Sequence, residues 1–220
     1  MILSIILILS FGYYAYTVFG LVKHWQMLEY KPSPTVTKSI SVVVVYRNEE
    51  SQLRRLLESL IAQNYPEDLL EVIFVDDHSN DDGYKHIVEY APKFKCKVKN
   101  LRLTDGSTGK KQGVMFGVSQ AQNQWILTTD ADCTFDVNWI TAMASVSEAT
   151  FVSGPVAFEA TNSFWGKLIE LDFISLITIG AALIKKREPI LANGANMLYT
   201  KSTFEEIGGY NNTLKIASGD

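Results

Sequence analysis

The sequence predicts an α/β fold, with a mixed but mainly parallel sheet flanked by helices and one transmembrane helix before it. Three observations support this prediction. The chain begins with a long uncharged apolar stretch. Apolar, β-branched runs then alternate with amphipathic helical patterns, as in α/β layer architectures. Finally, polar clusters follow the apolar runs, and in parallel sheets such strand ends gather on one edge.

Residues 1–22 carry no charged side chain. As a helix they would extend about 33 Å, enough to cross a hydrocarbon core of about 30 Å. A signal peptide is the competing interpretation, but there is no basic start and no small-residue cleavage site after the apolar run. Lys and Arg occur only after this stretch, so we expect a retained single-pass anchor in the cell membrane with everything downstream in the cytoplasm. Residues 23–39, with Pro32 and Pro34, read as a linker.

The remaining domain, residues 40–220, starts with a β-branched run over 40–46 that is typical of a strand buried on both faces. Leucines at helical spacing predict a helix over 53–61. A strand over 72–75, a helix over 84–90 and a strand over 98–103 complete a second unit. Right-handed crossovers between parallel strands are expected.

Composition narrows the possible functions. An apolar fraction of 47% with 20% charged residues describes a globular domain. The net charge of -4 gives no support for nucleic-acid binding. The two cysteines, Cys96 and Cys133, read as reduced thiols.

Polar residues follow three of the apolar strands, at 47–50, 76–82 and 130–132. Asp130 and Asp132 are two positions apart, so in an extended chain both carboxylates point to the same side. Such a pair suits Mg²⁺ or Mn²⁺, which bind carboxylate and phosphate oxygens. An Asp-rich turn is the alternative for this pair in isolation. The other two clusters on the same edge favour the metal.

A glycine- and lysine-containing loop spans 105–113, at the start of a predicted helix. Backbone N–H groups, the helix dipole and Lys110 or Lys111 could hold a phosphate there. The loop is not a P-loop, because Thr104 and Lys111 stand where that motif needs Gly and Ser or Thr. A solvated surface loop is the alternative.

Four motifs follow one another in the first part of the domain: Val44-Val45-Tyr46-Arg47-Asn48-Glu49-Glu50, Val75-Asp76-Asp77-His78-Ser79, Gly109-Lys110-Lys111 and Thr129-Asp130-Ala131-Asp132. Later segments are Gly154-Pro155-Val156, the stretch 164–186, Asn193 to Tyr199 and Gly208-Gly209-Tyr210. Taken together, the four motifs resemble the nucleotide-sugar-binding half of the family 2 glycosyltransferases, which have the GT-A fold. The later segments are similar to the membrane-bound processive and ceramide-glucosyltransferase-like branches.

The resemblance implies a metal-dependent, inverting transfer of sugar from a nucleotide-diphosphate sugar, expected to be a UDP-sugar, to a lipid or polysaccharide acceptor at the cytoplasmic membrane face. By the same resemblance, Asp132 would ligate Mg²⁺ or Mn²⁺, and Asp130 would contact the ribose or the metal's water shell. The residues expected at the donor are Tyr46, Asn48, Glu49, Asp76 or Asp77, Lys110 or Lys111, and Asp130; those expected at the acceptor are Asn193, Gly194, Ala195 and Asn196.

The resemblance also implies an acidic catalytic base shortly after the Gly-Gly-aromatic turn. Asp220 is then either the base or the first acid of a pair whose second member would follow it, and we expect the C-terminal part of the domain to be missing. For the stretch 164–184, Lys167, Glu170 and Asp172 disfavour a second membrane span and favour an interfacial or core helix.

Two other function classes remain open from the sequence. A nucleotidyltransferase on a similar scaffold would need a basic triphosphate loop near the first strand, and the sequence shows none there. A non-catalytic, membrane-tethered nucleotide-sugar-binding module would lack an acidic residue after Asp220.

Overall fold

The computed structural model describes residues 1–29, 38–104, 106–146, 149–159 and 162–211. The chain divides into two compact units. One contains residues 1–30 and 155–192, and the other contains residues 31–154 and 193–220. The second unit carries the sheet and the predicted donor residues.

The first unit contains two long helices, α1 (Ile2–Gln26) and α6 (Phe164–Lys186), which pack against each other. No residue of α1 is buried. Among the described residues, α1 is the one helix long and apolar enough to cross a membrane. α6 is capped by the Ser163 hydroxyl, which accepts a hydrogen bond from the Gly166 N–H at 2.9 Å, and it ends at Arg187 in the left-handed conformation.

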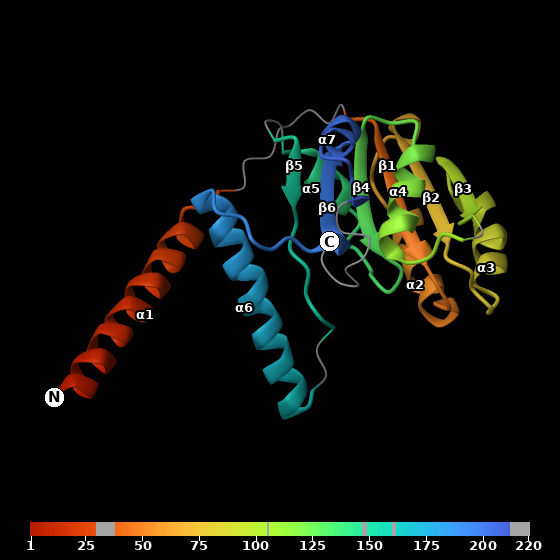
Figure 1. Cartoon of the computed structure of the whole chain (residues 1–220). Helices are drawn as coiled ribbons and strands as arrows, with labels where there is room; N and C mark the ends of the chain where they lie inside the picture. Colours follow the sequence, from red (N-terminus) through yellow and green to blue (C-terminus); the bar gives the residue numbers. More distant parts are fainter. Residues whose placement is uncertain (30–37, 105, 147–148, 160–161, 212–220) are drawn as a thin grey trace. The chain divides into compact units, whose positions relative to one another are not determined.

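The second unit is built on a six-stranded sheet with the order β3-β2-β1-β4-β6-β5 (Figure 1). β1, β2, β3 and β4 are parallel, whereas β6 is antiparallel to both β4 and β5. The strands are β1 (Ile40–Tyr46), β2 (Leu70–Asp76), β3 (Lys97–Arg102), β4 (Trp125–Asp130), β5 (Phe151–Ser153) and β6 (Met197–Thr200). The mixed, mainly parallel sheet predicted from the sequence is confirmed.

Helices cover both faces of this sheet. The helices are α2 (Glu50–Ile61), α3 (Gly83–Tyr90), α4 (Lys110–Gln120), α5 (Trp139–Ala144) and α7 (Lys201–Glu206), with short 3₁₀ turns at Glu67–Leu69, Ala91–Lys93 and Gly194–Asn196. Successive side chains of β1 point to opposite faces of the sheet and therefore pack against different helices. Val42 and Val44 belong to a core with α2, α3 and α5, while Val43 faces α4.

Two glycines allow α4 to approach the sheet closely. A Cβ at Gly113 would lie 2.6 Å from Val45 Cγ1, and a Cβ at Gly117 would lie 2.5 Å from Val43 Cγ1. The first turn of α4 therefore lies against β1, and Lys110 begins this turn.

The chain order of the strands creates a switch point between β1 and β4. From β1 the chain goes to β2 and β3 on one side, and then crosses to β4 on the other side of β1. In open α/β sheets, ligands bind outside the carboxyl ends of the strands at such a point. Tyr46 and Asp130 end the two strands.

Candidate functional site

A pocket of about 240 Å³ lies at the switch point, where β1 and β4 end. It is lined by Val45, Tyr46, Arg47, Glu49, Asp77, Lys110, Asp130, Ala131 and Asp132. The pocket is therefore lined by residues from all three polar segments predicted to share one edge, which follow β1, β2 and β4, and by a residue of the lysine loop.

The carboxylate pair is positioned by β4. Asp130 is the last residue of this strand and is in register with Val45 of β1, and Asp132 follows in the turn. The Lys110 Nζ lies 3.0 Å from Asp130 Oδ1, and both side chains are about two-fifths exposed or less. The lysine loop and the carboxylate pair thus already contact each other.

Glu49 adds a third carboxylate to the same pocket. Burial raises the pKa of Glu49 above its ordinary value, and the nearby negative charges of Asp132, Asp81 and Asp130 raise it further. The contribution of these neighbouring carboxylates, which is smaller than that of burial, indicates a concentration of negative charge that a bound cation would relieve.

The lining of this pocket fits a divalent cation. Four carboxylates (Glu49, Asp77, Asp130 and Asp132) face two cationic side chains, Arg47 and Lys110, which is a formal surplus of two negative charges. In the described part of the chain, no group of three or more His, Cys, Asp or Glu side chains is arranged to hold a metal by itself. One or two carboxylates completed by substrate phosphates is the usual arrangement for Mg²⁺, and Asp130 and Asp132 offer such a pair.

Asp77 fastens the lysine loop to the sheet. Its carboxylate accepts hydrogen bonds from the Gly109 N–H at 2.9 Å and from the Thr108 hydroxyl at 3.1 Å. Burial would raise the pKa of Asp77, but these hydrogen bonds, the one from His78 and the charge of Arg47 together lower it. Gly109 has a φ of 97°, which favours glycine, and Lys110 follows it directly.

Arg47 was not among the donor residues predicted from the sequence. Its Nη1 lies 3.7 Å from Asp77 Oδ2 and donates a hydrogen bond to the Thr108 hydroxyl at 3.3 Å. The side chain lines the pocket and is half exposed. Its place between Tyr46 and Asn48, at the end of a buried strand, was the available signal in the sequence.

Tyr46 lines the pocket, whereas Asp76 does not. The buried Tyr46 hydroxyl donates to Asn100 Oδ1 at 3.0 Å. Asp76 is 1% exposed, accepts the Ser79 N–H at 2.8 Å and pairs with Arg102 at 3.2 Å. Of the two acids proposed to read the nucleoside, Asp77 lines the pocket and Asp76 does not.

Asn48 joins two loops at the edge of the sheet. Its backbone N–H donates to the Ser79 hydroxyl at 3.1 Å, and its side-chain oxygen accepts the Asn80 N–H at 2.8 Å. Asn48 has a φ of 55°. It lines a different pocket from the one at the switch point.

The two lysines of the loop lie in different surroundings. Lys110 lines the pocket, whereas Lys111 is 9% exposed and its Nζ lies 6.0 Å from the centre of the Tyr210 ring. Lys110 is therefore the lysine within reach of a ligand in this cavity.

The four residues expected at the acceptor form the turn that enters β6. The Asn193 side chain accepts the Ala195 N–H at 3.0 Å, and the Gly194 carbonyl accepts the Thr128 hydroxyl at 2.9 Å. Asn196 is 7% exposed, and its Oδ1 accepts the Trp139 indole N–H at 3.0 Å. None of the four lines the switch-point pocket. Asp220, the expected base, lies outside the described residues.

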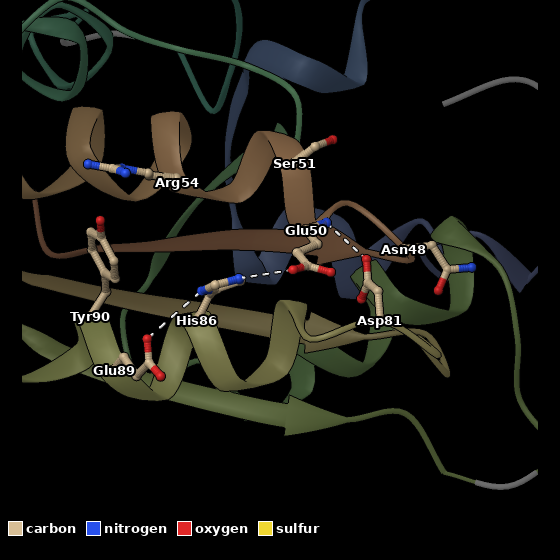
Figure 2. Close-up of a pocket in the computed structure, with 8 residues that line it drawn as sticks. All are labelled: Asn48, Glu50, Ser51, Arg54, Asp81, His86, Glu89 and Tyr90. Atoms are coloured by element: carbon tan, nitrogen blue, oxygen red, sulfur yellow. Dashed lines mark hydrogen bonds and ion pairs between the residues drawn. The ribbon is translucent and has the colours of Figure 1, made fainter.

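A larger cavity of about 600 Å³ lies between α2 and α3 (Figure 2). It is lined by Asn48, Glu50, Ser51, Arg54, Asp81, His86, Glu89 and Tyr90. His86 lies between two carboxylates, 3.3 Å from Glu50 and 3.9 Å from Glu89, and the Glu50 N–H donates to Asp81 at 2.9 Å. These contacts hold the two helix starts together, and Asp130 and Asp132 do not line this cavity.

Comparisons with known proteins identify the family and the fold. The model of the family described as Glycosyl transferase family 2 matches residues 41–208. The mannosyltransferase PcManGT from Pyrobaculum calidifontis, solved in complex with GDP-Man and Mn²⁺, is similar in structure with a TM-score of 0.71 at 19% identity, covering 92% of this chain and 57% of that one. TarS residues 1–349 from S. aureus, solved with UDP-GlcNAc, give a TM-score of 0.54 at 18% identity, covering 77% and 47%.

Relatives in sequence belong to the same group. TarS of Staphylococcus aureus, a poly(ribitol-phosphate) beta-N-acetylglucosaminyltransferase, is 35% identical over 92 residues, which is 42% of this chain and 16% of TarS. The glycosyltransferase AglE of Haloferax volcanii is 26% identical over 82% of this chain and 58% of AglE. The poly-beta-1,6-N-acetyl-D-glucosamine synthase of Staphylococcus epidermidis is 23% identical over 83% of this chain and 44% of the synthase.

The sheet order and the similarity to PcManGT show a GT-A fold. The chain belongs to glycosyl transferase family 2. It spans less than two thirds of the length of each of these three relatives.

Proposed function

We propose that this protein is a metal-dependent, inverting glycosyltransferase that moves a sugar from a nucleotide-diphosphate sugar, expected to be a UDP-sugar, to a lipid or glycan acceptor. The observation that carries the proposal is the switch-point pocket, where Asp130, Asp132 and Glu49 lie with Lys110 and Arg47. TarS and PcManGT, named above, were solved with UDP-GlcNAc and with GDP-Man and Mn²⁺.

Different residues of the pocket would bind the phosphates, position the lysine loop and hold the metal. Lys110 and Arg47 are the cationic side chains placed to receive negative phosphate oxygens. Asp77 holds the loop that carries Lys110, so this lysine is aimed at the cavity before the donor arrives. Asp130 and Asp132 would hold Mg²⁺ or Mn²⁺, which would supply Lewis-acid stabilisation of the leaving diphosphate.

The acceptor hydroxyl needs a base of its own. The carboxylates at the switch point face a site for a cation, so they are poorly suited to accept this proton. We propose that the base is Asp220 or the second acid of a pair that Asp220 begins. General-base catalysis typically contributes a factor of about 100 to 10,000.

Two features of the first unit support a membrane location. α1 can cross a bilayer by its length and composition, and Lys and Arg occur only after its apolar stretch, which favours a cytoplasmic domain. α6 exposes many large apolar side chains, namely Phe164, Trp165, Leu168, Ile169, Leu171, Ile174, Leu176, Ile179 and Ile184. We propose that the protein is membrane-anchored; recovery in the soluble fraction after expression without detergent would contradict this.

The direct test of the proposed function is titration of the detergent-solubilised chain with UDP and with GDP, each with and without Mn²⁺, by calorimetry. We expect UDP to bind, Mn²⁺ to strengthen its binding at least about tenfold, and Asp132→Ala to remove this effect. Asp136→Ala, which changes an Asp outside the pocket, is the matched control. Absence of nucleotide binding by the wild type, or an unchanged Mn²⁺ effect in Asp132→Ala, would refute the proposal. Binding of UDP without any sugar transfer would favour the non-catalytic module.

A further inference from the structure

Lys110 contacts a carboxylate that a metal ion in this pocket would also contact. Its Nζ lies 3.0 Å from Asp130 Oδ1, and this carboxylate is half of the Asp130–Asp132 pair. A lysine ammonium and a divalent cation repel each other, and both are attracted to the same oxygen. The Lys110 side chain and a metal ion would therefore compete for Asp130.

The backbone around this contact is fixed from both sides. Lys110 starts α4, and the preceding Gly109 N–H is held by the buried Asp77 at 2.9 Å. Asp130 ends the central strand β4, in register with β1. The loop and the strand end can therefore stay in place while the long lysine side chain changes its partner.

We propose that Lys110 acts as an internal counter-ion, which neutralises Asp130 in the empty pocket and transfers to the donor diphosphate when the metal takes this carboxylate. This inference deepens the proposed function and rests on it. Lys110 lowers the affinity for the metal alone, because it must first leave Asp130. It raises the affinity for metal and nucleotide together, because the diphosphate gives its charge a new partner.

The consequence is positive coupling between metal and nucleotide that depends on this side chain. Coupling between two ligands is reciprocal, so UDP should strengthen Mn²⁺ binding by the same factor by which Mn²⁺ strengthens UDP binding. A lysine that only contacts phosphate would strengthen UDP binding equally with and without Mn²⁺, so its removal would leave the coupling factor unchanged. The decisive measurement is therefore the coupling factor, together with the affinity for Mn²⁺ in the absence of nucleotide.

The experiment measures Mn²⁺ binding to the full chain by electron paramagnetic resonance of the free ion, without UDP and at saturating UDP, after the complex of Mn²⁺ with UDP in buffer has been determined. For Lys110→Met we expect Mn²⁺ alone to bind at least about fivefold more tightly, and the strengthening by UDP to fall by at least about fivefold. Lys85→Met is the matched control, because Lys85 pairs with Asp82 on α3, outside the pocket.

Each result decides between the inference and the proposed function. If the wild type binds both ligands with coupling but Lys110→Met binds Mn²⁺ alone no more tightly, only the counter-ion role is wrong. If UDP and Mn²⁺ bind the wild type independently, the counter-ion role and the metal dependence of the proposed function are both wrong, and this measurement needs no variant. If the wild type binds neither ligand, the proposed function fails as well. Thermal unfolding checks that Lys110→Met is folded, which requires an unfolding temperature equal to that of the wild type. If this variant is not folded, Lys110→Gln is used instead.

Discussion

Gly113→Ala should test whether the close contact between α4 and β1 positions the donor site. The new Cβ would lie 2.6 Å from Val45 Cγ1, 2.9 Å from Cγ2 and 3.3 Å from Cβ, whereas ordinary contacts begin at 3.4 Å. The helix must therefore move away by about 0.5–0.8 Å, because the two methyl groups of Val45 fill two of its three staggered positions and every rotamer leaves at least one of the close positions filled. Overpacking of this kind costs about 1–3 kcal/mol, and the better helix propensity of Ala returns at most about 1 kcal/mol.

The expected net loss is about 1–2 kcal/mol in the free energy of unfolding, measured by urea denaturation. UDP affinity should also fall about three- to tenfold, or roughly 0.7–1.4 kcal/mol, because Lys110 lies one turn before Gly113 on the displaced helix. Calorimetry with UDP and Mn²⁺ measures this effect.

Two further variants control this result. Ser119→Ala changes an exposed residue of the same helix and should leave both stability and affinity near the wild-type values. Val45→Ala removes the obstructing methyl groups, so the double variant should be more stable than the sum of the two single changes predicts. A Gly113→Ala protein as stable as the wild type, or additivity in this double-mutant cycle, would refute the steric argument.

Two predictions concern other acidic residues. Glu71 is 2% exposed, and its carboxylate accepts a hydrogen bond from the Ser41 hydroxyl at 2.5 Å and pairs with Lys99 at 3.2 Å. Burial raises the pKa of Glu71, but these partners outweigh it and hold the pKa below its ordinary value. Glu71→Gln should lower the free energy of unfolding by about 1–3 kcal/mol at pH 7. A carboxylate of lowered pKa loses its stabilising effect as the pH falls, so the difference in stability between wild type and variant should shrink below about pH 4.5. An equal difference at pH 7 and pH 4, measured by urea unfolding, would contradict this. Asp220→Asn should reduce sugar transfer by about 100- to 10,000-fold with unchanged affinity for UDP in calorimetry, and wild-type turnover in this variant would remove Asp220 from the mechanism.

Much of the fold was accessible from local patterns. The β-branched run at 40–46 and the apolar run at 72–75 are strands because both faces of each are covered, and the structure confirms them as parts of β1 and β2. Asp130 ends β4 as predicted, but Asp132 lies in the turn that follows, so the extended alternation expected for the pair does not reach Asp132. The antiparallel strand β6 gave no such signal. It has only four residues, too few to show a clear alternation, and its pairing partner β4 lies about seventy residues earlier in the chain.

The sequence by itself determined the α/β class, the apolar first helix, the family resemblance and the polar clusters, because each depends on spacing along the chain. Only the tertiary structure decided which members of each cluster face the cavity: Asp77 rather than Asp76, and Lys110 rather than Lys111. It also added Arg47 to the site and placed Asn193–Asn196 in a buried turn. The physical reason is that neighbouring residues at a strand end or helix start point in different directions, and the direction is set by the strand register and by the contact of α4 with β1.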